Sequence, residues 1–236
     1  AASSPIVEMR RSPYLDARMD FYRSNARRVP SVSGHIIPEP VFSEDEYRTQ
    51  ILERIYADLA PLDPDGILRD EWVNARGAIA RFDRNAIEVR VIDVQECPRA
   101  DLAILQLVIA VIRALVEEKW CGYEWQRAWA VAPLEEVLLA TIRDGETATI
   151  DNLKYLALFG LRGDTACPAR EVWSHLAKTL LPDGAVKQSL RTILTQGTLA
   201  TRIANALNDP LTRDVVATVY RELCSCLAED RLFGSG

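Results

Sequence analysis

The stretch from residue 74 to residue 101 (NARGAIARFDRNAIEVRVIDVQECPRAD) constrains the fold more than any other part of this sequence. It contains two short apolar runs, at residues 78–82 and 87–92, which are separated by the turn-prone residues 83–86. Two such runs joined by a short polar connection predict an antiparallel β-hairpin. Asn85 suits a left-handed backbone position within the connection. We therefore expect antiparallel sheet in this chain beside its helices.

Side chains alternate along the second run of the hairpin. Ile87, Val89 and Val91 are expected on one face, and Glu88 and Arg90 on the other. Two interpretations fit a carboxylate beside a guanidinium on a polar face. The first is a cross-strand ion pair on a solvated surface. The second is a binding site, since arginine donors match phosphate oxygens and carboxylates bind magnesium.

Two further arginines precede this strand. Arg76 and Arg81 are five residues apart, so they have opposite parity and cannot both point to one face of a regular strand. Either Arg76 lies in a loop before the strand, or a β-bulge lies between the two residues.

These residues resemble a known family. The sequence IEVRVID, followed by an apolar helix, resembles the glutamine synthetase-like ligases, whose corresponding strand carries Glu-x-Arg-x-x-Asp and is preceded by a pair of arginines. A closer resemblance is to the type 2 glutamate–cysteine ligases, also called carboxylate–amine ligases, and it covers about residues 1–120. The matching residues are Ser3-Ser4-Pro5, Ala17-Arg18 and the sequence from Glu88 to Asp93.

The resemblance implies an enzyme that joins the γ-carboxylate of glutamate to an amine, with cysteine as the expected amine, through an acyl phosphate made from ATP. The implied cofactors are ATP and Mg²⁺, and Arg18 would bind the substrate carboxylate. The implied roles in the hairpin are magnesium binding by Glu88, catalysis by Arg81 and Arg90, nucleotide binding by Arg76, Arg81 and Arg90, and orientation of Arg90 by Asp93.

The expected fold class is α+β: an antiparallel sheet portion of a glutamine synthetase-like catalytic fold, followed by a mostly helical region. The predicted domains are residues 1–97 and residues 98–236. The resemblance also implies that an N-terminal half of the same enzyme, or a second subunit, completes the sheet, and that this chain is the C-terminal portion. A homo-oligomer is compatible with this arrangement.

Helices are predicted by apolar periodicity and by their capping residues. A capping box, Ser43-Glu44-Asp45-Glu46, opens a predicted helix that buries Tyr47, Ile51, Ile55 and Leu59. The helix predicted at residues 98–119 has a wide apolar face that is expected to pack on the back of the sheet: Leu102, Leu105, Val108, Ile109, Ile112 and Val116. Other helices are predicted at residues 14–28, 133–143, 151–159, 168–181, 185–196, 198–207 and 211–230.

Composition excludes several classes of protein. With 48% hydrophobic and 26% charged residues among 236, the sequence is typical of a soluble globular protein. A net charge of −6 argues against a general nucleic-acid binder. No apolar run reaches the roughly 18 residues of a membrane span, so no membrane partner is expected. The five cysteines, an odd number, suit a reducing cytoplasm.

An alternative from a different class is a non-catalytic helical interaction or regulatory domain that retains a vestigial ligase strand. Among isolated candidates, His35 could act as a general base, although a lone histidine in a loop is more often structural. Glu39, between two prolines, could contact a polar substrate. His175, Cys224 and Cys226 are interpreted as helix packing residues.

Overall fold

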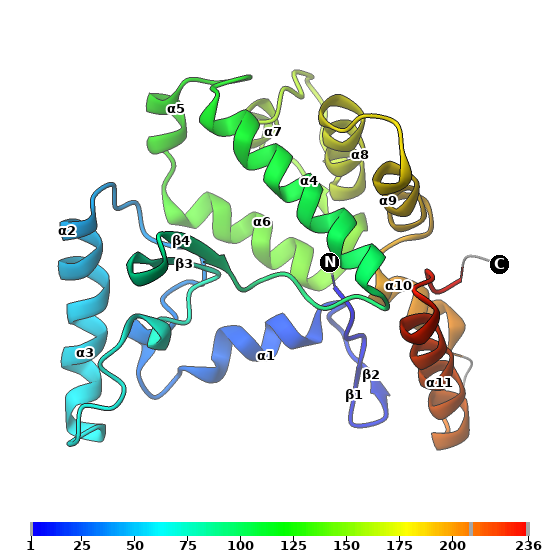
Figure 1. Ribbon diagram of the computed structural model, residues 1–236, viewed down its shortest axis with the longest axis horizontal. Coiled ribbons are helices and arrows are strands. Elements are labelled where there is room, and N and C mark those ends of the chain that lie inside the picture. The colour runs from blue at the N-terminus through cyan, green and yellow to red at the C-terminus, as the bar shows by residue number, and fades with distance from the viewer. Residues whose placement is uncertain (1, 208–209, 235–236) are drawn as a thin grey trace. The chain divides into compact units, whose positions relative to one another are not determined.

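The computed structural model describes residues 2–207 and 210–234. Helices alternate with small antiparallel strand pairs, so the predicted α+β class is confirmed (Figure 1). Within the described residues, no helix combines the length and the apolar character needed to cross a membrane.

Contacts divide the chain into two compact units. Unit 1 comprises Ala1–Ala17, Asp93–Ala128 and Leu139–Gly236, and unit 2 comprises Arg18–Ile92 and Trp129–Leu138. The predicted domains, residues 1–97 and 98–236, stay a prediction, because such contacts group residues without showing which of them fold independently.

Unit 2 is built around a helical run and a hairpin. The run comprises α2 (Glu44–Tyr47), a π-helical segment (Arg48–Leu52) and α3 (Glu53–Leu59). Its first turn is capped as predicted, because Ser43 Oγ accepts a hydrogen bond from the Glu46 amide at 3.2 Å. The predicted apolar stripe is buried in a cluster that also contacts Ala80 and Phe82 of the hairpin. Helix α1 (Ala17–Asn25) enters this unit from unit 1.

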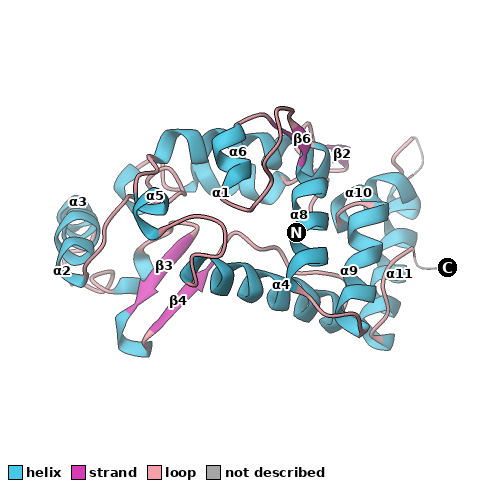
Figure 2. Ribbon diagram, turned by 90° about the horizontal axis from the view of Figure 1, so that it is seen from above, coloured by secondary structure: helices cyan, strands magenta, loops and turns pink. Residues whose placement is uncertain are grey.

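The hairpin consists of β3 (Ala78–Arg81) and β4 (Ala86–Val89), with Ile79 opposite Glu88 and Arg81 opposite Ala86 (Figure 2). Asn85 closes the connection at φ 48° and ψ 47°, the left-handed conformation predicted for it. Strand β4 ends at Val89, three residues before the end of the predicted apolar run. Ile87 is 75% exposed, so the apolar face of β4 is open at this residue.

Unit 1 is mainly helical, and it also contains two short strand pairs, β1 (Ile6–Val7) with β2 (Arg10–Arg11) and β5 (Thr149–Ile150) with β6 (Cys167–Pro168). Its helices are α4 (Pro98–Val116), α5 (Tyr123–Arg127), α6 (Val131–Asp144, which begins in unit 2), α7 (Leu153–Ala157), α8 (Ala169–Leu180), α9 (Ala185–Gln196), α10 (Leu199–Ala206) and α11 (Arg213–Glu229). The predicted helices therefore exist, with ends that differ by no more than three residues, but α5 and the strand pairs of unit 1 were not predicted.

Helix α4 packs against α8 and α9, and the two views of Figures 1 and 2 agree on this. The face predicted to be inside is outside: Leu102, Leu105, Ile109, Ile112 and Val116 are 46–77% exposed. The buried face carries Ala100, Ala103, Leu107, Val111 and Ala114. Small alanines let the neighbouring helices approach closely, whereas the larger leucines and isoleucines remain outside.

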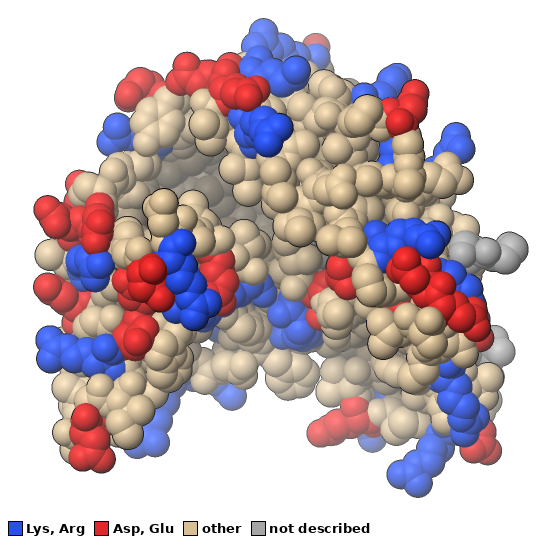
Figure 3. Space-filling model, in the orientation of Figure 1, with Lys and Arg blue, Asp and Glu red and all other residues tan. Residues whose placement is uncertain are grey.

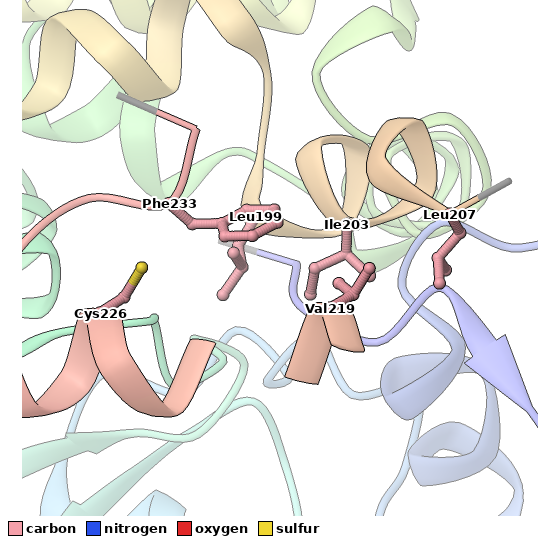
Figure 4. Packing of buried hydrophobic residues seen from close by; sticks show 6 residues of the cluster. All are labelled: Leu199, Ile203, Leu207, Val219, Cys226 and Phe233. Carbon is pink, nitrogen blue, oxygen red and sulfur yellow. The ribbon is translucent and has the colours of Figure 1, made fainter. Parts of the chain in front are cut away.

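The C-terminal part of unit 1 has its own apolar cluster. Helices α10 and α11 and the segment after α11 enclose Leu199, Ile203, Leu207, Val219, Cys226 and Phe233 (Figure 4). Beside this cluster lies a buried ion pair, in which Arg202 Nη1 donates to Glu96 Oε1 at 2.5 Å. The same Glu96 oxygen accepts from the Phe233 amide at 3.1 Å. Glu96 therefore ties the segment before α4 to both α10 and the segment after α11.

Candidate functional site

Glu88 lies between two arginines on the hairpin. Arg81 Nη1 donates to Glu88 Oε2 at 3.1 Å, and Arg90 Nε donates to Glu88 Oε1 at 2.8 Å. The Glu88 side chain is 40% exposed. Glu88 of β4 thus lies together with Arg81 of β3 and with Arg90, which follows β4. Strand alternation predicted that Glu88 and Arg90 share a face. Their contacts are the ion pairs of the first interpretation, and they leave the carboxylate accessible, as the second interpretation requires.

Arg90 is held on one side by backbone carbonyls. Its Nη1 donates to the carbonyl oxygens of Trp72 at 3.2 Å and Asn74 at 2.6 Å. Among the described residues, its Nη2 has no hydrogen-bond partner. The bonds of Arg90 within unit 2 are to Glu88 and these two carbonyls, and its orientation by Asp93 stays a prediction. Arg90 thus has a fixed position and still has donors available for another group.

Arg81 lies deeper, with an 11% exposed side chain surrounded by carboxylates. Besides Glu88, its neighbours are Asp83 at 3.4 Å and Glu71 at 3.8 Å. Desolvation opposes the charge of Arg81, but the hydrogen bond to Glu88 and the charge of Asp83 raise its pKa overall. The hydrogen bond from Arg90, together with that from Arg81, lowers the pKa of Glu88. Arg81 and Glu88 are therefore both charged at neutral pH.

Arg76 is separate from this cluster. It lies before β3, in the loop that one of the two sequence interpretations required. It is 2% exposed, and its Nη2 and Nε form a two-pronged pair with Glu39 at 2.6 and 2.5 Å. Its Nη1 donates to the carbonyl oxygen of Ser31 at 3.1 Å. Burial raises the pKa of Glu39, but the bonds and charge of Arg76 outweigh this effect, so the pKa is lowered. The nucleotide-binding role of Arg76 stays a prediction.

Arg18 is the second residue of α1, and its Nη2 donates to the carbonyl oxygen of Val91 at 3.0 Å. That contact fastens α1 to the segment that follows β4. The substrate-binding role of Arg18 stays a prediction. His35 is exposed, and its Nδ1 lies 3.0 Å from Glu135 Oε1. This contact with a carboxylate is consistent with the structural interpretation of His35.

The serines of the Ser-Ser-Pro motif and the aspartate of the Glu-x-Arg-x-x-Asp motif are hydrogen-bonded to each other within unit 1. Asp93 Oδ2 accepts hydrogen bonds from Ser3 Oγ at 2.6 Å and from Ser4 Oγ at 3.1 Å. Asp93 Oδ1 accepts from the Val94 amide at 3.0 Å. The sequence showed both motifs but did not indicate that they are bonded to each other.

The hairpin can be tested for its fit to magnesium. Each oxygen of Glu88 accepts one hydrogen bond, so each keeps a lone pair for a metal ion. Magnesium is commonly held by one or two protein carboxylates together with nucleotide phosphates and water. In the described part of the chain, no group of three histidines, cysteines or acidic residues is arranged to hold a metal ion. The hairpin therefore fits magnesium as a single-carboxylate contribution that phosphates would complete.

On the face that Figure 3 shows, the charged side chains do not form a patch of one sign. Figure 3 shows Lys and Arg side chains lying among Asp and Glu side chains on the face in view.

Sequence reasoning missed two residues next to the cluster, Glu71 and Asn74. Neither has a local signal, because both act through loop contacts that depend on the fold.

Residues 1–150 match the family model described as glutamate–cysteine ligase family 2. An uncharacterized protein of Archaeoglobus fulgidus is 43% identical over 118 residues, which are 50% of this chain and 32% of that protein. This chain thus spans about a third of that relative's length. No solved structure matches.

Proposed function

Because this chain belongs to glutamate–cysteine ligase family 2, we propose that it forms part of an ATP-dependent carboxylate–amine ligase. The proposed reaction joins the γ-carboxylate of glutamate to cysteine. ATP first phosphorylates the carboxylate, and the amine then displaces phosphate from the acyl phosphate.

The residues of the hairpin have charges suited to this chemistry. Glu88 would hold magnesium, which would neutralise phosphate charge when it is bound. Arg90 and Arg81 would stabilise negative charge on the transferred phosphoryl group, because phosphoryl transfer depends mainly on positioning and electrostatic stabilisation. Arg18 would bind the carboxylate of the amino-acid substrate, since its planar fork matches two oxygens. A further part of the enzyme or a second subunit would supply the remaining metal ligands.

One observation carries the proposal: an accessible Glu88 carboxylate lies between two arginines, and one of them has free donors. An ion pair that served only stability would not need backbone carbonyls to fix Arg90 while its Nη2 has no acceptor among the described residues. In an enzyme that binds a triphosphate, that nitrogen meets a phosphate oxygen.

The test is an assay of ADP formation by the complete gene product, with glutamate and a panel of amines, in the presence and absence of Mg²⁺. We expect magnesium-dependent ADP release that requires both substrates, with cysteine as the best amine. Glu88→Ala should lower the rate by roughly 100-fold or more. The matched control is Asp83→Ala, which removes another carboxylate of the same hairpin and should change the rate only a few-fold. An active Glu88→Ala enzyme would contradict the metal assignment.

A second candidate is a non-catalytic interaction domain, and the exposed apolar face of α4 favours it. Exposed apolar surface of this kind often marks a protein contact. Calorimetry separates the two candidates, because the interaction domain should show no magnesium-dependent ATP binding.

A further inference from the structure

Asn74 is fully buried, and it lies at a junction between the hairpin and the helical run of unit 2. It follows a short 3₁₀ helix (Glu71–Val73), and its backbone is extended, with φ −62° and ψ 115°. We propose that Asn74 is a positioning residue that fixes the guanidinium of Arg90, so that one edge of this guanidinium is presented to a phosphoryl oxygen. This inference rests on the function proposed above for Arg90.

The side chain of Asn74 is held at both of its polar atoms. Its Oδ1 accepts from the Arg76 amide at 3.2 Å and from Arg76 Nη1 at 3.0 Å. The first of these bonds closes a turn in which an asparagine side chain bonds to the backbone two residues later. Its Nδ2 donates to the hydroxyl of Tyr47 at 2.8 Å, and this hydroxyl also accepts from the Ala80 amide of β3 at 3.0 Å. The side chain thus fixes where its own backbone lies relative to β3.

The backbone carbonyl of Asn74 acts on Arg90. It accepts a hydrogen bond from Arg90 Nη1 at 2.6 Å, which is the shortest of the three hydrogen bonds that hold this guanidinium. Nε and Nη1 together carry three of the five N–H groups of an arginine, and all three have acceptors here. Because the guanidinium is planar and rigid, fixing Nε and Nη1 also fixes Nη2. The two remaining N–H groups are on Nη2, so Asn74 determines where they point.

The carbonyl itself is present in any residue, so the contribution of asparagine is the position of that carbonyl. Alanine at this position would lose the bonds to Arg76 and Tyr47, and the loop could move the carbonyl away from Arg90. Aspartate would keep the acceptor for the Arg76 amide and could accept from the Tyr47 hydroxyl. Asn74→Ala therefore removes the contacts that position the carbonyl, whereas Asn74→Asp removes the amide group and keeps the acceptor that positions the loop.

The experiment compares Asn74→Ala, Asn74→Asp and a control, Leu52→Ala, in the complete protein. Leu52 is buried in the same unit, and its substitution removes apolar packing without removing a hydrogen bond to the Asn74 side chain. The first readout is ¹⁵N NMR of the Arg90 side chain. We expect Nε–H exchange with water to be faster in Asn74→Ala than in the wild type, and unchanged in Asn74→Asp and Leu52→Ala.

The second readout is steady-state kinetics of ADP formation. We expect kcat of Asn74→Ala to fall about 10- to 100-fold with KM for ATP changed less than about threefold, because small misplacements of a charge-stabilising group mainly affect the transition state. In an Arg90→Lys background, the same substitution should add less than about threefold, because both changes then act on one group.

The outcomes separate the two proposals. Unchanged Arg90 Nε–H exchange in Asn74→Ala would overturn the positioning role, whatever the activity. The positioning role would also be overturned if Asn74→Ala lowered kcat by the same factor in the Arg90→Lys background as in the wild type. Normal turnover by Arg90→Ala would instead reject the proposed function of Arg90, while the NMR result would still decide whether Asn74 positions it. Should Asn74→Ala fail to fold, Tyr47→Phe tests the same link, since it removes the acceptor of the Asn74 amide group.

Discussion

Glu96→Ala should lower the free energy of unfolding by about 3–5 kcal/mol, the usual cost of removing one partner of a buried ion pair. Glu96 is completely buried at its side chain, and Arg202 is 4% exposed. Among the described residues, the substitution leaves the Arg202 charge with neutral acceptors only, the carbonyl oxygens of Gly197 and Phe233. It also removes the acceptor of the Phe233 amide.

The pair is not fully satisfied even in the wild type. Glu96 Oε2 and Arg202 Nη2 are buried and have no hydrogen-bond partner among the described residues. Burying two charges is costly, and this cost is only partly offset when some of their polar atoms remain unbonded. The double variant Glu96→Leu/Arg202→Met should therefore be close to the wild type in stability, or more stable, because it removes both charges and keeps apolar volume.

The assay is urea unfolding at 25 °C followed by far-UV circular dichroism, with linear extrapolation to water. A suitable control is Arg143→Ala, since Arg143 is paired with Asp144 on the surface and is 62% exposed. Such exposed pairs contribute only about 0–1 kcal/mol. A loss below about 1 kcal/mol for Glu96→Ala, or a double variant less stable than both single variants, would refute the reasoning.

Three other predictions follow from the structure. Tyr47→Phe should cost about 1–3 kcal/mol in urea unfolding, since it removes a buried acceptor of two hydrogen bonds. Gly77→Ala should cost about 1–3 kcal/mol by overpacking, because a Cβ at this position would lie 2.6 Å from Cγ1 of Val91. Gly163→Ala is the control, since Gly163 has open space around it and its φ is not in the left-handed region. The pKa values of Glu39 and Glu88 are lower in the folded protein than in the unfolded chain. Their charged forms therefore stabilise the fold fully above about pH 4.3, the pKa of an unperturbed glutamate, and this stabilisation is lost as the pH falls through the lowered pKa values of the folded state. Urea midpoints measured from pH 7 to pH 3 should fall in the acid range, and they should fall less in Glu39→Gln; equal acid sensitivity in this variant would exclude Glu39 as a source.

Local features were predictable because local chemistry determines them. The hairpin, the left-handed Asn85 and the cap at Ser43 each depend on residues within a few positions of one another. The grouping of Glu88 with Arg90 also followed from strand alternation, whereas the contact of Arg81 with Glu88 depends on the register of the hairpin.

The orientation of α4 could not be predicted in this way. This helix carries apolar residues on both faces, so its periodicity does not identify the face that is buried. The choice depends on α8 and α9, which follow much later in the sequence and pack on the face with small side chains. Similarly, Arg76 and Glu39 are separated by 37 positions, and only the fold reveals that they pair.

The shared oxygen of Asp93 has an evolutionary consequence. Because Ser3 and Ser4 both donate to one atom of a residue 89 and 90 positions away, mutations at the two places should not accumulate independently. Homologous genes in which this aspartate has been replaced by a residue without an acceptor should have diverged at the serines too. An alignment in which the serines persist regardless of the aspartate would mean that selection maintains them for another reason.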